Sequence, residues 1–157
     1  MKKLIMMAAV LLTATQLNAQ DYKTGIGMRF GLSNGITARH NIDQYKAIEG
    51  ILSFRWHGFN LTGLYELQYE DAFKVDHLNW YFGGGANIGI AQDEYYENDK
   101  EQTGSQLILG IDGVIGMEYN FNEVPLNISL DWKPLVNLTG ADFIADEVAF
   151  SVRYLIK

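Results

Sequence analysis

Hydrophobic and polar residues alternate along residues 107–121, which read LILGIDGVIGMEYNF. Period-two alternation is typical of a β-strand whose two faces meet different environments. A strand in a globular protein averages about 5–6 residues, whereas a strand that crosses a bilayer needs roughly 9–11. The length of this segment therefore predicts a membrane-crossing strand. Such a strand requires a closed barrel, because open sheet edges would leave backbone groups unpaired in lipid.

The same alternation recurs seven more times along the chain, separated by turn signals such as Ser33-Asn34-Gly35. The predicted strands span residues 24–32, 36–42, 47–56, 59–70, 78–90, 107–121, 126–133 and 148–156. Two long loops, 91–106 and 134–147, follow the fifth and seventh strands and therefore lie at the same end of a meander. Outer-membrane barrels combine long external loops with short periplasmic turns. The pattern predicts an all-β, eight-stranded antiparallel up-and-down transmembrane β-barrel.

Side-chain volume indicates which face of this barrel points outward. The lumen of an eight-stranded barrel is just wide enough for its side chains to fill it. The apolar face carries nearly all the large rings, which could not fit inside, so we expect it to face lipid. The rings also predict two aromatic belts, one near each membrane boundary. The external belt comprises Trp56, Phe59 and Trp132, and the periplasmic belt comprises Trp80, Tyr119, Phe121 and Tyr154.

Charges of both signs occupy the opposite, inward face. The predicted lumen charge network comprises Arg29, Arg39, Glu49, Arg55, Glu66, Asp112, Glu118, Asp131, Lys133 and Arg153. Buried charges must be paired and hydrogen-bonded, because each isolated ion costs several kcal/mol. We expect a salt-bridged plug that fills the lumen. A narrow gated ion path is the alternative, and a catalytic carboxylate pair would rest only on the abundance of acidic residues.

The N-terminus predicts export through a cleavable signal peptide over residues 1–19. Lys2 and Lys3 precede an apolar stretch, and Leu17-Asn18-Ala19 forms a plausible cleavage site. Residues 20–157 then form one outer-membrane β-barrel domain with 10 basic and 19 acidic side chains. This acidic balance argues against a nucleic-acid partner, which would require a basic face. The chain has no cysteine, so a closed, fully hydrogen-bonded barrel is the expected source of stability.

No motif predicts a cofactor, a metal site or a catalytic residue. The histidines, His40, His57 and His77, lie on different strands or turns without metal-ligand spacing. The triple glycine at 83–85 lacks the Lys-Ser/Thr and the helix of a phosphate-binding loop, so close backbone approach explains it better. Residues 92–102 form an acidic stretch, QDEYYENDKEQ. Such a run is usually a solvated loop, and binding of a divalent cation or of a partner is the alternative.

Several stretches carry a family resemblance that covers most of residues 20–157. They are AIEGI at 47–51, GLYE at 63–66, NWYFG at 79–83, PLNISLDWKP at 125–134 and SVRY at 151–154. With these stretches the chain resembles the small OmpA/OmpX-like outer-membrane barrels, and more closely a poorly characterised outer-membrane β-barrel family of Gram-negative bacteria. The resemblance implies the barrel fold and no catalytic residue. The chain departs from many such barrels at its C-terminus, which ends in Lys157 rather than an aromatic residue.

These observations predict a non-enzymatic outer-membrane protein with a structural or surface-interaction role and no cofactor. Its expected partners are membrane lipid, the barrel-insertion machinery during biogenesis, and an extracellular partner that binds through loops 91–106 and 134–147. Three alternatives remain open. They are a narrow gated ion pore, a secreted lipocalin-like binder of apolar small molecules, and an enzyme that acts on lipid at the barrel rim.

Overall fold

The computed structural model describes the backbone of residues 23–55, 58–70, 72–97 and 100–156. The predicted signal peptide and Trp56 lie outside the described residues. The strands, in chain order, are β1 (Thr24–Gly31), β2 (Asn34–Asp43), β3 (Lys46–Arg55), β4 (Gly58–Tyr69), β5 (Leu78–Glu97), β6 (Lys100–Asn120), β7 (Leu126–Trp132), β8 (Leu135–Asn137), β9 (Asp142–Ile144) and β10 (Val148–Ile156). A single 3₁₀ turn, η1 (Ala72–Lys74), precedes β5. Among these residues, no helix is long and apolar enough to cross a membrane.

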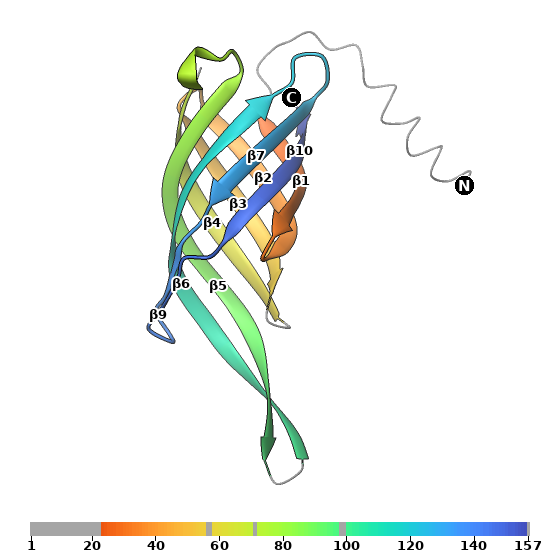
Figure 1. Ribbon diagram of the computed structural model, residues 1–157, viewed down its shortest axis with the longest axis vertical. Helices are drawn as coiled ribbons and strands as arrows, with labels where there is room; N and C mark the ends of the chain where they lie inside the picture. The colour runs from red at the N-terminus through yellow and green to blue at the C-terminus, as the bar shows by residue number, and fades with distance from the viewer. Residues whose placement is uncertain (1–22, 56–57, 71, 98–99, 157) are drawn as a thin grey trace, which may run out of the picture.

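The sheet closes into a barrel. Each of β1 to β7 pairs antiparallel with its neighbour along the chain, β10 pairs with β7, and β10 also pairs with β1 through Thr24↔Ile156 to Gly31↔Ala149. Eight strands therefore surround one lumen, in up-and-down order (Figure 1). Each of the eight predicted strands coincides with one of these strands, and the predicted all-β, eight-stranded antiparallel up-and-down barrel is confirmed.

The connections β2–β3, β4–β5 and β6–β7 lie at one end of the barrel, here called the turn end, which is at the top of Figure 1. The connection through η1 has residues with positive φ that are not glycine, including Phe73 (57°), Lys74 (62°) and His77 (66°). The opposite end, here called the loop end, carries the β5–β6 hairpin, which projects far beyond the barrel in Figure 1.

Our prediction of a loop at residues 91–106 is wrong. β5 continues to Glu97 and β6 begins at Lys100, so most of this segment is a two-stranded antiparallel ribbon with Tyr95 opposite Gln102. The second predicted loop, 134–147, likewise contains the small hairpin β8–β9, in which Val136 pairs with Phe143. The β5–β6 ribbon escaped detection because it pairs with no third strand beyond the barrel, so its side chains need not alternate. The strand β8 pairs with β6 and alternates buried Leu135 with exposed Val136, but its three residues are too few for a period-two pattern to be recognised.

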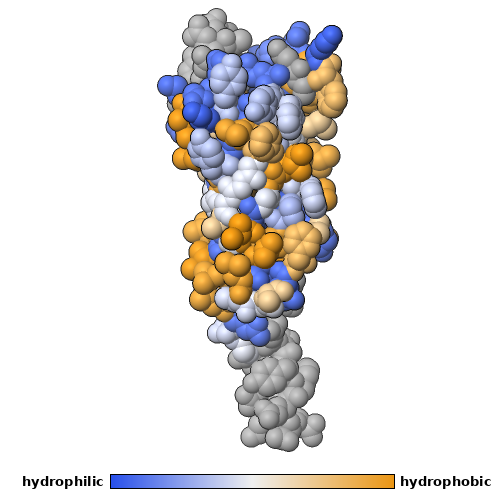
Figure 2. Space-filling model, turned by 90° about the vertical axis from the view of Figure 1, so that its left-hand side faces the viewer, coloured by the Kyte–Doolittle hydropathy of each residue, from blue (hydrophilic) through white to orange (hydrophobic). Residues whose placement is uncertain are grey.

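Within the barrel, side chains alternate strictly between the wall's two faces. Along β4, Leu61 and Tyr65 are exposed outside while Thr62 and Glu66 are buried inside. The outward face is largely apolar, and Figure 2 shows two orange zones separated by a paler band on one side of the molecule. Inside, Ile51, Leu64, Tyr81 and Val114 form a small buried apolar cluster.

The glycines of β5 permit close approach between strands. A Cβ added to Gly83 would overlap the carbonyl oxygen of Tyr65 on β4, and one added to Gly85 would overlap the carbonyl oxygen of Gly63. By contrast, a Cβ on Gly63 itself would meet no atom within 4 Å. The inward glycines of β5 are therefore required by the tight curvature of the wall.

Candidate functional site

Nine of the ten predicted lumen charges lie inside the barrel and are buried. They are Arg29, Arg39, Glu49, Glu66, Asp112, Glu118, Asp131, Lys133 and Arg153. The side chain of Arg55, the tenth, lies outside the described residues, although its backbone ends β3. The inward position of each follows from strand alternation, because every second residue of a barrel strand points into the lumen.

Two cations are each matched to one carboxylate. Arg29 on β1 forms a two-pronged contact with Asp131 on β7, with Nη1 donating over 2.8 Å and Nη2 over 2.5 Å. Arg153 on β10 pairs with Glu49 on β3 across the lumen. Arg153 Nη1 also donates to Asn127 Oδ1 (3.0 Å) and Ser129 Oγ (2.9 Å). The two ion pairs tie strands that are not neighbours in the sheet, whereas the contacts of Arg153 with Asn127 and Ser129 join β10 to its neighbour β7.

Two other cations are each shared between two carboxylates. Arg39 lies between Glu118, which its Nη1 contacts, and Glu66, whose Oε2 is 2.9 Å from Nε. Lys133 Nζ is 2.7 Å from Asp112 Oδ1 and 3.3 Å from Glu147 Oε1. Six buried carboxyl groups thus share four buried cations in the described part of the lumen. The network couples opposite walls from the turn end to the loop end.

Two members of this network were not predicted from the sequence. The ring of Tyr81 is fully buried, donates its hydroxyl proton to Asp131 Oδ2 (3.1 Å), and lies under the Arg39 guanidinium, 4.6 Å from the ring centroid. Its inward position follows from strand alternation, but alternation gives no sign that an aromatic ring joins a charge network. Glu147 falls in a predicted loop, yet it is buried and accepts a hydrogen bond from Ser33 Oγ (2.7 Å).

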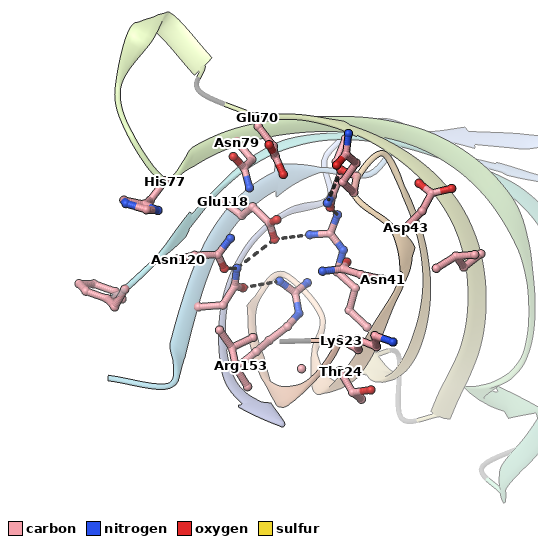
Figure 3. Close-up of a pocket in the computed structure, with 18 of the residues that line it drawn as sticks. Lys23, Thr24, Asn41, Asp43, Glu70, His77, Asn79, Glu118, Asn120 and Arg153 are labelled. Atoms are coloured by element: carbon pink, nitrogen blue, oxygen red, sulfur yellow. Dashed lines mark hydrogen bonds and ion pairs between the residues drawn. The ribbon is translucent and has the colours of Figure 1, made fainter. Parts of the chain in front are cut away.

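A polar cavity of about 690 Å³ opens at the turn end of the lumen, and we refer to it as the turn-end cup (Figure 3). Arg39, Glu118 and Arg153 lie at its floor. Its walls are rich in carboxamides, which come from Asn41, Gln44, Gln68, Asn79, Asn120, Asn122 and Asn127. Asn127 Nδ2 donates to Glu118 Oε2 (3.0 Å) and to Asn120 Oδ1 (2.8 Å), which fixes one wall. The cup therefore presents rigidly held polar groups to solvent.

The predicted belt residues within the described part lie on the outward face. Phe59, Trp132, Trp80 and Phe121 are exposed, and Tyr119 and Tyr154 are partly exposed. At the turn end, Tyr69 and Trp80 stack with ring centroids 5.1 Å apart, and Tyr119 meets Phe121 edge to face at 5.0 Å. Such pairs contribute about 0.5–1.5 kcal/mol beyond burial. The aromatic residues of this end thus form an ordered surface.

The described residues contain no cluster of three or more His, Cys, Asp or Glu side chains that could hold a metal ion. His40 Nδ1 lies 2.9 Å from Thr24 Oγ1 on the outward face, and His77 Nε2 lies 2.7 Å from Asn122 Nδ2 at the rim of the cup. The two histidines are thus engaged in separate local contacts. Neither contact involves the lumen charges.

Comparison with known proteins supports the fold. No family model and no curated protein matches the sequence. Among solved structures, the chain is similar to the N-terminal β-barrel domain of Pseudomonas aeruginosa OprF, with a TM-score of 0.64 at 10% sequence identity. The match covers 85% of this chain and 96% of that one. At this identity the similarity shows a shared eight-stranded barrel fold and leaves function to be argued from the molecule itself.

Proposed function

We propose that this protein is an outer-membrane β-barrel with a closed lumen and a structural or surface-interaction role. The main observation in support is that apolar side chains lie outside and charged side chains inside, the reverse of a water-soluble protein. Large apolar residues such as Met28, Leu32 and Ile36 are more than half exposed on the outer wall, while the charged residues lie inside. A largely apolar outer surface is stable in hydrocarbon and would drive aggregation in water. The similarity to the OprF barrel domain supports the same location.

The lumen favours a closed barrel over the gated pore that we also considered. Arg29, Arg39 and Arg153 reach across it and are held by carboxylates on other strands. A buried apolar cluster around Ile51 and Tyr81 also occupies part of the lumen. Opening a path would require desolvated ion pairs to separate, which costs several kcal/mol per ion. The lipocalin-like alternative would need an enclosed apolar cavity, and the charged lumen offers no support for one.

The interaction role is assigned to the loop end. The β5–β6 ribbon extends beyond the wall with the acidic stretch 92–102 at its tip, and the β8–β9 hairpin exposes Leu138 and Phe143. Under the proposed orientation both hairpins face the cell exterior. An extracellular partner would bind there, because this end combines an acidic ribbon with exposed apolar side chains.

Membrane fractionation of the expressed protein tests the location, together with a gel shift between unboiled and boiled samples. We expect recovery in the outer membrane, a heat-modifiable band and a mature N-terminus at Gln20. A soluble periplasmic or secreted protein would overturn the proposal. Planar-bilayer recordings test the closed lumen separately. The wild type should be silent, and steady single-channel currents would instead establish the pore.

A further inference from the structure

The turn-end cup has polar groups that the protein itself does not use. Asn79 on β5 is 7% exposed and points toward Glu118, its direct cross-strand partner on β6 (Figure 3). Its carboxamide has no hydrogen-bond partner among the described residues. Because Asn79 lines the cup, its carboxamide is open to water or to a ligand in the cavity. The cup therefore offers polar groups to a partner from outside the chain.

Two neighbouring side chains on the same wall can make further hydrogen bonds. Asn120 Oδ1 accepts from Asn127, which leaves the Asn120 NH₂ group as a donor. Glu118 Oε2 takes the hydrogen bonds from Arg39 and Asn127, and within the described residues Oε1 has none. Together with Asn79, this wall offers donors and acceptors side by side.

The cations at the floor do not make the cup an anion site. Arg39 is occupied by Glu66, Glu118 and Gln68, whose Oε1 is 3.1 Å from Arg39 Nη2. Arg153 is occupied by Glu49, Asn127 and Ser129. An anion would have to displace a carboxylate from a buried guanidinium, which leaves that carboxylate unpaired and costs several kcal/mol. The floor of the cup therefore does not favour an anionic ligand.

We infer that the turn-end cup is a binding site for a neutral saccharide. Each sugar hydroxyl both donates and accepts, and so matches the mixed wall of Asn79, Glu118 and Asn120. Leu155, which also lines the cup, supplies apolar surface for the carbon face of a sugar ring. The cavity volume of about 690 Å³ lies within the roughly 300–1,000 Å³ of small-molecule sites, which suits a ligand of the size of a disaccharide.

An NMR titration of the ¹⁵N-labelled full chain in detergent micelles tests this inference. The probes are cellobiose and N,N′-diacetylchitobiose as neutral saccharides, triglycine as a peptide, and inorganic phosphate as an anion. We expect one or both saccharides to shift the backbone amides of residues 79, 118 and 120 in a saturable way. The loop end should not respond. Absence of saturable shifts with both saccharides would overturn the inference, as would equal or tighter binding of triglycine or phosphate.

Asn79→Ala should weaken saccharide binding about tenfold, the loss expected for a well-placed hydrogen bond of about 1.4 kcal/mol. The matched control is Asn34→Ala, which removes an exposed carboxamide at the opposite end of the barrel and should leave binding unchanged. If Asn79→Ala fails to fold, Asn120→Ala removes the neighbouring donor instead. Unchanged affinity in the folded variant would contradict the assignment. Because binding in micelles does not depend on cellular location, this result and the fractionation result can fail independently.

Discussion

Strands β5 and β6 each have two parts, one in the barrel wall and one in the ribbon beyond it. Both parts form the same antiparallel ladder, but their surroundings differ. Inside the barrel, β4 pairs with β5 from Trp80 to Ile90, and β7 pairs with β6 from Ile115 to Asn120. Beyond Ala91 and Gln106, the described ladders of β5 and β6 join only these two strands to each other. The backbone conformation is the same in both parts. The alternation of apolar and polar residues is therefore imposed by the two environments of the wall.

The same comparison predicts where the free energy of unfolding resides. The barrel part contributes inward side chains to a network that connects opposite walls, whereas the ribbon has no third strand to stabilise it. Substitutions in the lumen should therefore be costly, and changes to the ribbon should leave the barrel intact.

Removal of Arg153 should have the largest effect. Arg153→Ala leaves Glu49 buried without its cation, and we expect a loss of about 3–5 kcal/mol in the free energy of unfolding. Urea unfolding in micelles or bilayers measures it. The control is Lys46→Ala, which breaks the exposed pair with Asp43 (3.6 Å) and should cost about 0–1 kcal/mol. Similar losses in both variants would show that lumen pairing does not stabilise the barrel.

Removal of both partners of one lumen pair should cost less than removal of one. Arg29→Met alone leaves Asp131 without its cation, whereas Arg29→Met combined with Asp131→Leu leaves no buried charge at this place. The Tyr81 hydroxyl then loses its acceptor, which costs about 1–3 kcal/mol. A double-mutant cycle measures the coupling. Strictly additive losses would contradict an energetic link between the two side chains.

The wall itself should be sensitive where strands approach closely. Gly85→Ala places a Cβ against the carbonyl oxygen of Gly63 and should destabilise the barrel by about 1–3 kcal/mol. Gly63→Ala is the matched control, because its Cβ meets nothing within 4 Å. Unfolding curves of the two variants should therefore separate. If Gly63→Ala is as harmful as Gly85→Ala, crowding at β5 is not the cause.

The barrel could be predicted from the sequence because the alternation of apolar and polar residues repeats in every strand of the wall. Alternation also placed Tyr81 and Asn79 inside. It does not show which residues approach one another across the lumen. Which charges pair depends on how β1 faces β7 and how β3 faces β10, and this follows only from closure of the barrel. Cavity shape is equally nonlocal, so the turn-end cup could not be predicted. Glu147 was missed because its burial comes from the path of a loop rather than from a strand period.

Shortening the ribbon should have the smallest effect on the barrel and gives the sharpest test of the comparison. A variant in which an Asn-Gly turn replaces residues 92–105 joins Ala91 to Gln106, which are already cross-strand partners. The barrel ladders, the lumen charges and the turn-end cup all remain, so the free energy of unfolding should change by no more than about 0.5 kcal/mol. Heat modifiability and saccharide binding should also persist, while binding of any extracellular partner to the ribbon should be lost.

Retained partner binding would move the interaction surface to the β8–β9 hairpin. A loss of several kcal/mol in stability would mean that the ribbon stabilises the wall, which would contradict the separation of the two halves of β5 and β6.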